Sequence, residues 1–146
     1  MLEEIKQELD KIKDCWETQD GISDSDYSKL EKKIFDLKDE ESFSTIMTLL
    51  ISLRKKIGLE NDWQTEQWWE NVSDFMSEQI LETIIFICSD CLADDFILLS
   101  EIFEDITQKS KSKDFVRCIE ETSKKYSAAC EENNVFSVIQ DCKNFL

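Results

Sequence analysis

The sequence predicts an all-α protein, and three observations carry that prediction. The 146-residue chain contains no Pro and only two Gly, whereas sheet proteins need such turn residues every few positions. Apolar side chains return every three or four residues along the chain, which is the spacing of amphipathic helices. Apolar residues make up 41% of the composition, enough for a core. We therefore expect one helical domain over residues 1–146, with about eight helices in antiparallel hairpins that form a bundle or a short α-solenoid-like stack.

Three helices are expected before residue 58. The second begins after a polar run with Ser23 or Ser25 as its cap, and the third is capped by Ser42. The third ends in the basic triplet Arg54–Lys56, with Gly58 as a C-terminal stop. The triplet is either a helix end matched to the helix dipole or a phosphate site, and the lack of a Gly-rich loop favours the helix end. The apolar stripe of the first helix consists of Leu2, Ile5, Leu9, Ile12 and Trp16.

Two helices are expected between residues 63 and 92. The first, roughly Trp63–Met76, is predicted to bury Trp68 and Trp69. The second, Ser77–Leu92, is apolar around most of its circumference, and a helix of that kind belongs in the middle of a structure. We therefore expect Ile80–Leu92 to be core.

The remaining chain is predicted to form three more helices. The first is capped by Asp94 or Asp95 and has acids on the face opposite its apolar side. The other two cover about 112–129 and 134–145. A weak repeat with a period of 35 also runs through the chain; it is typical of stacked helical hairpins, although regular helix lengths alone also produce it. The repeat places three serines before helices, Ser42, Ser77 and Ser112.

The negative charge is concentrated in one stretch. The chain has a net charge of −16, and Gly58–Gln108 contains no Lys or Arg but thirteen acids, so this stretch contributes −13. On the predicted helices these acids form two stripes, one on the Trp63 helix and one on the helix that follows Asp95. An exposed Trp beside acids is typical of a binding anchor, and the alternative is that Trp63 only covers the helix start. The candidate partner-binding residues are Trp63, Glu66, Glu70, Asp74, Glu101, Glu104 and Asp105.

The six cysteines are expected to be reduced thiols. The N-terminus is charged from its third residue, which predicts no signal peptide and a cytoplasmic protein. Cys88 and Cys91 match the C-x-x-C pattern of redox sites and half zinc sites. The chain has no His and no second such pair, so buried packing is the preferred interpretation for both.

The composition excludes most enzyme classes. Without His there is no Ser-His-Asp or Cys-His system, and two isolated glycines allow neither phosphate-binding loop motif. Carboxylate chemistry with Mg²⁺ remains open, but the helical nucleotide pyrophosphohydrolases use paired motifs, and Glu101-x-x-Glu104 is a single one. The longest apolar run, Ile84–Cys88, is five residues, against about 20 for a membrane span. We therefore predict no enzyme, no catalytic residue, no cofactor and no metal ligand.

The overall profile resembles the immunity proteins, or antitoxins, of bacterial polymorphic and contact-dependent toxin systems. Those proteins are small, cytosolic, strongly acidic and often helical, and they pair with basic nuclease toxins. The resemblance lies in composition and in the acidic and aromatic block Trp63–Asp105, not in a motif. It implies a non-enzymatic toxin inhibitor whose acids occupy the cationic cleft that the toxin uses for nucleic acid.

Two other functions remain open from the sequence. One is a helical adaptor or regulator, including a viral modulator of host signalling, that binds a partner helix or peptide in a hairpin groove. The other is that the acids only provide solubility. In every case the negative charge argues against direct contact with nucleic acid or membrane, and the oligomeric state is undetermined.

Overall fold

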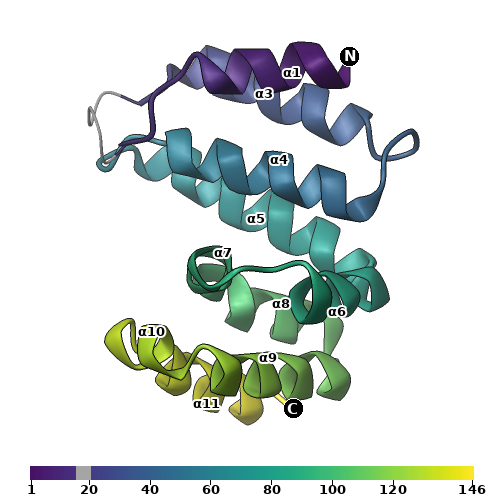
Figure 1. The fold of residues 1–146 in the computed structure, drawn as a ribbon, viewed down its shortest axis with the longest axis vertical. Coiled ribbons are helices and arrows are strands. Elements are labelled where there is room, and N and C mark those ends of the chain that lie inside the picture. Colours follow the sequence, from purple (N-terminus) through teal and green to yellow (C-terminus); the bar gives the residue numbers. More distant parts are fainter. Residues whose placement is uncertain (16–20) are drawn as a thin grey trace. The chain divides into compact units, whose positions relative to one another are not determined.

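The computed structural model describes residues 1–15 and 21–146, and these residues form helices and connections without a β-strand (Figure 1). The all-α prediction is confirmed. The chain forms two compact units, Met1–Trp68 and Trp69–Leu146. The boundary falls inside one continuous helix, α5 (Asp62–Glu78), so the single helical domain stays a prediction.

The first unit contains α1 (Leu2–Asp10), α3 (Asp24–Asp36), α4 (Phe43–Lys56) and the first part of α5. Helix α3 packs against both α1 and α4. Two predicted caps are confirmed, because Ser23 accepts a hydrogen bond from Asp26 N and Ser42 accepts one from Thr45 N. The first helix ends earlier than its predicted stripe, and Trp16 lies outside the described residues.

The two glycines of the chain lie against each other. Helix α4 ends at Lys56 and its capping residue Ile57 is extended, with φ −70° and ψ 128°, so the prediction of Gly58 as the helix stop is wrong. Gly21 has a φ of +65°, a conformation that residues with a Cβ rarely adopt. A Cβ on Gly21 would lie 2.5 Å from the backbone nitrogen of Gly58 and 2.7 Å from its Cα. Position 21 therefore needs glycine, because its backbone passes in close contact with the backbone of Gly58.

The basic triplet at the end of α4 includes a buried ion pair. Lys56 is 9% exposed, and its Nζ lies 2.6 Å from Asp14 Oδ1. Lys56 is thus a structural residue, as the helix-end interpretation of the triplet requires. In the same unit, Trp68 of α5 is fully buried, and its Nε1 donates a hydrogen bond to the carbonyl oxygen of Leu50 at 2.8 Å.

The second unit contains the end of α5 and the rest of the chain. Within it α6 packs against α9, α8 against α11, and α7 against α10. The core includes the rings of Phe96, Phe103 and Phe115, all fully buried, with the Phe96 and Phe103 centroids 5.2 Å apart. Its elements are α6 (Ile80–Ser89), α7 (Ala93–Leu99), the short 3-10 turn η1 (Ser100–Ile102), α8 (Phe103–Ser110), α9 (Lys113–Lys125), α10 (Ser127–Glu132) and α11 (Val135–Asn144).

Two of the predicted helices are broken. The helix expected after Asp94 is divided by η1, and the cap prediction is wrong because Leu92 holds that position without a side-chain bond while Asp94 and Asp95 lie in the first turn. The helix expected over 112–129 breaks at Tyr126, whose φ is −114° and ψ 39°. The Tyr126 hydroxyl donates to the carbonyl oxygen of Cys91 at 2.8 Å. The break therefore positions an aromatic side chain that ties α10 to the end of α6.

Helix α6 is not the buried core helix that the sequence predicts. It buries Thr83, Phe86 and Ile87, whereas Leu81 is 71% exposed and Ile85 is 56% exposed. Leu92, beyond its end, is 71% exposed. Cys88 is also exposed, while Cys91 is buried as expected. Leu81 and Ile85 are four apart on α6 and consequently form a surface ridge, which we define by these two residues.

The 35-residue repeat fails at its middle position. Ser112 caps α9 by accepting a hydrogen bond from Phe115 N, as Ser42 caps α4. Ser77 instead lies inside α5, near its end, and its Oγ is buried without a hydrogen-bond partner. Helix α6 follows with Gln79 at its capping position and no side-chain cap bond. Regular helix lengths therefore account for the repeat.

Candidate functional site

The seven candidate partner-binding residues divide between the two units. Trp63 and Glu66 belong to the first unit, and the second unit holds the other five. Glu66, Glu70, Asp74 and Glu101 are exposed, whereas Glu104 and Asp105 are half-buried. The structure shows contacts among the members of the second unit.

Trp63 covers the start of α5 and also keeps an exposed surface. Its ring meets the buried ring of Tyr27 edge to face, with centroids 6.3 Å apart and an interplanar angle of 77°. The side chain is nevertheless 46% exposed. Trp63 thus covers the helix start, and the packing against Tyr27 also holds the exposed part of its ring in place.

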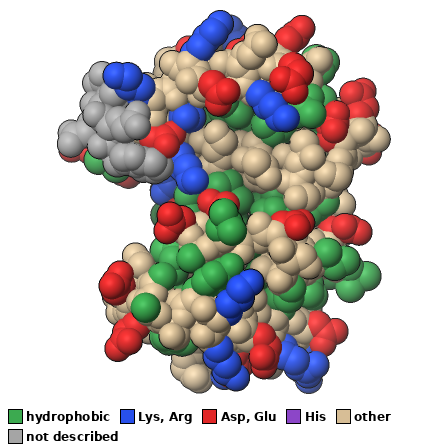
Figure 2. Space-filling model, viewed as in Figure 1, with side chains coloured by type: hydrophobic (Ala, Val, Ile, Leu, Met, Phe, Trp, Pro, Cys, Tyr) green, Lys and Arg blue, Asp and Glu red, His purple; other side chains and the backbone are tan. Residues whose placement is uncertain are grey.

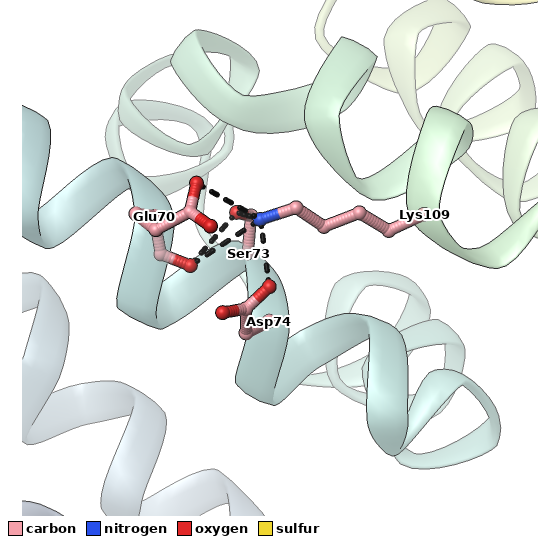
Figure 3. A network of polar contacts seen from close by, with 4 residues as sticks. All are labelled: Glu70, Ser73, Asp74 and Lys109. Atoms are coloured by element: carbon pink, nitrogen blue, oxygen red, sulfur yellow. Dashed lines mark hydrogen bonds and ion pairs between the residues drawn. The ribbon is translucent and has the colours of Figure 1, made fainter.

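One lysine joins two of the acids on α5 (Figure 3). Lys109 Nζ lies 2.8 Å from Asp74 Oδ1 and 3.3 Å from Glu70 Oε2. The same ammonium donates to Ser73 Oγ at 2.7 Å and to the carbonyl oxygen of Glu70 at 3.4 Å. Lys109 comes from α8, so this network, which we call the Lys109 cluster, connects the two helices that carry the acidic stripes. No cation is close in sequence to Glu70 and Asp74, but the fold supplies one.

Asp105 lies beside the Lys109 cluster. Burial raises the pKa of Asp105, the attraction of Lys109 opposes that rise, and repulsion from Glu70 adds to it. For Lys109, burial acts to lower the pKa, but hydrogen bonds and attraction from Asp74 and Glu70 outweigh burial and raise it. The lysine therefore stays charged, and its ammonium attracts three carboxylates, those of Glu70, Asp74 and Asp105.

Trp69 connects the remaining exposed acid to α5. The sequence predicts Trp69 to be buried, but it is half-buried, and its Nε1 donates to Glu101 Oε2 at 3.1 Å. Glu101 lies in η1, the turn that breaks the predicted helix. The turn thus brings a carboxylate to the indole N–H of Trp69 and pairs two side chains from α5 and η1.

Glu104 faces a different helix. Burial raises the pKa of Glu104, and Asp141 raises it further by repulsion and by a hydrogen bond between the two carboxyl groups. Asp141 belongs to α11, which packs against α8. Glu104 and Asp141 thus form a carboxyl pair, and Glu104 is a weaker candidate for attracting a cationic partner than the exposed acids are.

The sequence reasoning missed four residues of this region. Lys109 follows Asp105 by four positions on α8, a spacing that favours an ion pair along a helix and was the available signal. The other contacts depend on which helices pack together, which the sequence pattern does not give. The four missed residues are Trp69, Ser73, Lys109 and Asp141.

The candidate residues are not part of a metal cluster or of the best-formed groove among the described residues. Within residues 1–15 and 21–146, no group of three or more Cys, Asp or Glu side chains is arranged to hold a metal ion. A groove of about 360 Å³ lies between α1 and α3, where it is lined by Lys11, Lys29 and Lys33 among others and by none of the seven candidate residues. A search of the same residues found no helix that is both long and apolar enough to span a bilayer. The exposed candidate acids are Glu66, Glu70, Asp74 and Glu101.

One face of the molecule carries side chains of both charges (Figure 2). Figure 2 shows acidic and basic side chains interspersed on the face in view, with hydrophobic side chains exposed among them. Comparison with known proteins gives no relative, since no protein-family model, curated protein or solved structure matches the chain.

Proposed function

We propose that this protein is a non-enzymatic cytoplasmic binding protein that neutralises a basic protein partner, as an immunity protein does when it occludes the active site of a nuclease-type toxin. The observation that carries the proposal is the stretch Gly58–Gln108, which has thirteen acids and no Lys or Arg. Its carboxylates at Glu66, Glu70, Asp74 and Glu101 are exposed. An acidic surface of this kind accelerates encounter with a cationic partner and discriminates against anionic ones.

The Lys109 cluster gives this surface a fixed geometry. One ammonium holds Glu70 and Asp74 in place while contributing a single positive charge against the thirteen negative charges of the stretch. Carboxylates that are already positioned lose less side-chain freedom when they bind, so more of the interaction energy becomes affinity. A guanidinium of the partner can approach the free lone pairs of these carboxylates and bind them in a fork geometry.

A helical adaptor is the second candidate, and the exposed ridge on α6 supports it. Leu81 and Ile85 are each more than half exposed, and they are four apart on one helix, as in surfaces that receive an amphipathic helix. The two candidates differ in their main driving force. Association driven by acids weakens steeply with salt, whereas association driven by the apolar ridge does not.

The proposal is tested with proteins that are encoded next to the gene of this chain. A neighbouring reading frame that ends in a basic domain is expressed with and without this protein, and purified domain is then titrated against the purified chain. We expect growth inhibition by the domain alone, rescue by co-expression, and an association rate that falls at least about tenfold between 50 and 300 mM NaCl, roughly the range in which screening removes long-range attraction.

Two variants with the same change in net charge show whether the location of the acids matters. The first is Glu66→Gln, Glu70→Gln and Asp74→Asn. The second, the control, is Glu121→Gln, Glu131→Gln and Glu132→Gln, which removes three exposed acids outside the stretch. The first variant should slow association far more than the second. If the two variants slow association equally, only the net charge of the protein matters and not the position of the acids. An association rate that does not change with salt would favour the adaptor.

A further inference from the structure

Two cysteine thiols that are far apart in the sequence lie in direct contact. Cys88 is near the end of α6 and Cys118 is in the middle of α9, and these two helices pack against each other. Their Sγ atoms are 2.9 Å apart. A disulfide needs a separation of about 2.05 Å, so less than one ångström of movement joins the two sulfurs.

The sequence motif points to a different pair, and the structure does not support that pair. Cys91, the second cysteine of the C-x-x-C pattern, is 4% exposed, and its Sγ contacts the carbonyl oxygen of Leu92 at 3.7 Å. Burial and, after it, the nearby carboxylates of Asp95 and Asp90 together raise the pKa of Cys91 to about 12. Cys91 therefore remains an unreactive thiol, and the thiol that contacts Cys88 is that of Cys118.

We propose that Cys88 and Cys118 are a modification site, at which a low-molecular-weight disulfide such as glutathione disulfide converts the two thiols into a reversible cross-link between α6 and α9. The proposal stands on the contact between the sulfurs and on their unequal exposure, and it does not depend on the proposed function. Cys88 is exposed and Cys118 is 6% exposed. The oxidant therefore meets Cys88 first, and Cys118 resolves the adduct.

The exchange has two balanced steps. The thiolate of Cys88 attacks one sulfur of glutathione disulfide, which forms a mixed disulfide and releases one glutathione thiolate. Cys118 then attacks Sγ of Cys88, the bond between that Sγ and the bound glutathione breaks, and a second glutathione leaves. The two protons of the protein thiols end on the two glutathione molecules, and the electrons that reduce glutathione disulfide come from the two cysteines.

The second step is fast because of proximity and not because of acidity. Burial and, after it, the adjacent Cys88 together raise the pKa of Cys118 to about 12, so little thiolate exists at neutral pH. A nucleophile held within contact distance of its target gains an effective concentration of many orders of magnitude. The departing glutathione thiolate accepts the proton of Cys118 as the new bond forms.

The test uses the full chain incubated with glutathione disulfide at neutral pH, followed by alkylation of free thiols and non-reducing digestion. Trypsin leaves Cys88 and Cys91 in one peptide, because Gly58–Gln108 contains no Lys or Arg. A second cleavage at Asp90 separates them. We expect mass spectrometry to show the Cys88 fragment joined to the peptide that contains Cys118, with the loss of two hydrogens, and Cys91 alkylated.

Variants make the result decisive. Cys118→Ser should stop at a glutathione adduct on Cys88, Cys88→Ser should give neither product, and Cys91→Ser should cross-link like the unmodified chain. Cross-linking should also raise the melting temperature by roughly 5–10 °C, since it closes a loop in the unfolded chain, and this rise should be absent in Cys88→Ser. A Cys88–Cys91 disulfide, or an unmodified chain in which Cys88 keeps its glutathione adduct, would overturn the proposal.

Discussion

At the scale of single residues, Lys109 supplies a cation to acids that have none close to them in the sequence. It follows directly after the stretch without cations, and its ammonium returns to Glu70 and Asp74 within that stretch. A partly exposed ion pair contributes little stability by itself, about 0–1 kcal/mol. Its larger effect is geometric, because it fixes two carboxylates that would otherwise repel each other and sample many rotamers.

Gly21 is the residue with the strictest steric requirement. Gly21→Ala places a Cβ 2.5 Å from the Gly58 nitrogen at a φ of +65°, and we expect it to lower the free energy of unfolding by at least about 2 kcal/mol. Urea unfolding followed by circular dichroism measures this loss. Ser25→Ala, at an exposed position of α3, serves as the control and should change stability by less than about 0.5 kcal/mol. Equal, small effects would mean that the two backbone segments are not in contact.

Glu104 should make stability depend on pH. Its pKa is raised in the folded state, first by burial and then by Asp141, and the unfolded value is about 4.3. Between those two values the folded state binds more protons, so stability falls as pH rises through the window and stays lower above it. We expect Glu104→Gln to be more stable than the unmodified chain at neutral pH and to lose that advantage near pH 4, a value just below the unfolded pKa of about 4.3.

The measurement is urea unfolding at both pH values. Glu82→Gln, at an exposed acid of α6, is the control because it removes the same formal charge from the surface. If Glu104→Gln gains no more than the control at neutral pH, the carboxyl pair of Glu104 and Asp141 does not carry the effect.

At the scale of elements, the serines of the 35-residue repeat allow a direct comparison, because Ser42 and Ser112 cap helices and Ser77 does not. Ser112 caps α9, so Ser112→Ala should cost about 1 kcal/mol. Ser77 is buried inside α5 with no partner for its Oγ, so Ser77→Ala removes an unsatisfied polar atom and should be neutral or stabilising. Ser42→Ala is the positive control, since Ser42 caps α4. If Ser77→Ala lowers stability as much as Ser112→Ala does, Ser77 has a capping role and the 35-residue repeat holds at its middle position.

The helices were predictable wherever local spacing decides the structure. The buried residues Ile5 and Leu9 were predicted from apolar periodicity, because side chains three and four apart share one face. Helix α6 was predicted wrongly for the opposite reason. Its outer residues, such as Leu81 and Ile85, are as apolar as its inner ones, and only the number of neighbouring helices decides which of them are covered.

The same distinction limits what could be predicted of the candidate site. The identity of the acids and the exposure of Trp63 follow from composition and helical phase. The pairing of Lys109 with Glu70, and of Glu104 with Asp141, depends on helices α5, α8 and α11 meeting in space. The break at η1, which brings Glu101 to Trp69, has no Gly or Pro to mark it in the sequence.

At the scale of the whole molecule, each of the two units carries a net negative charge. Residues 1–68 contain 17 acids and 10 bases, and residues 69–146 contain 16 acids and 7 bases, so the two units carry −7 and −9 and sum to the chain total of −16. Such an excess keeps a protein soluble, but it also destabilises the compact state through self-repulsion. The repulsion extends over about 30 Å at 0.01 M salt and about 10 Å at 0.1 M.

Salt should therefore stabilise this protein. We expect the melting temperature to rise by several degrees between about 10 mM and 300 mM NaCl, because screening weakens the many repulsive pairs more than the few ion pairs such as Lys109–Asp74. Differential scanning fluorimetry measures the shift. The variant Glu121→Gln, Glu131→Gln and Glu132→Gln lowers the net negative charge and should respond less to salt. A melting temperature that falls with salt would instead show that attractive ion pairs outweigh the repulsion, and the acids of Gly58–Gln108 would then be stabilised within the fold and not available to a basic partner.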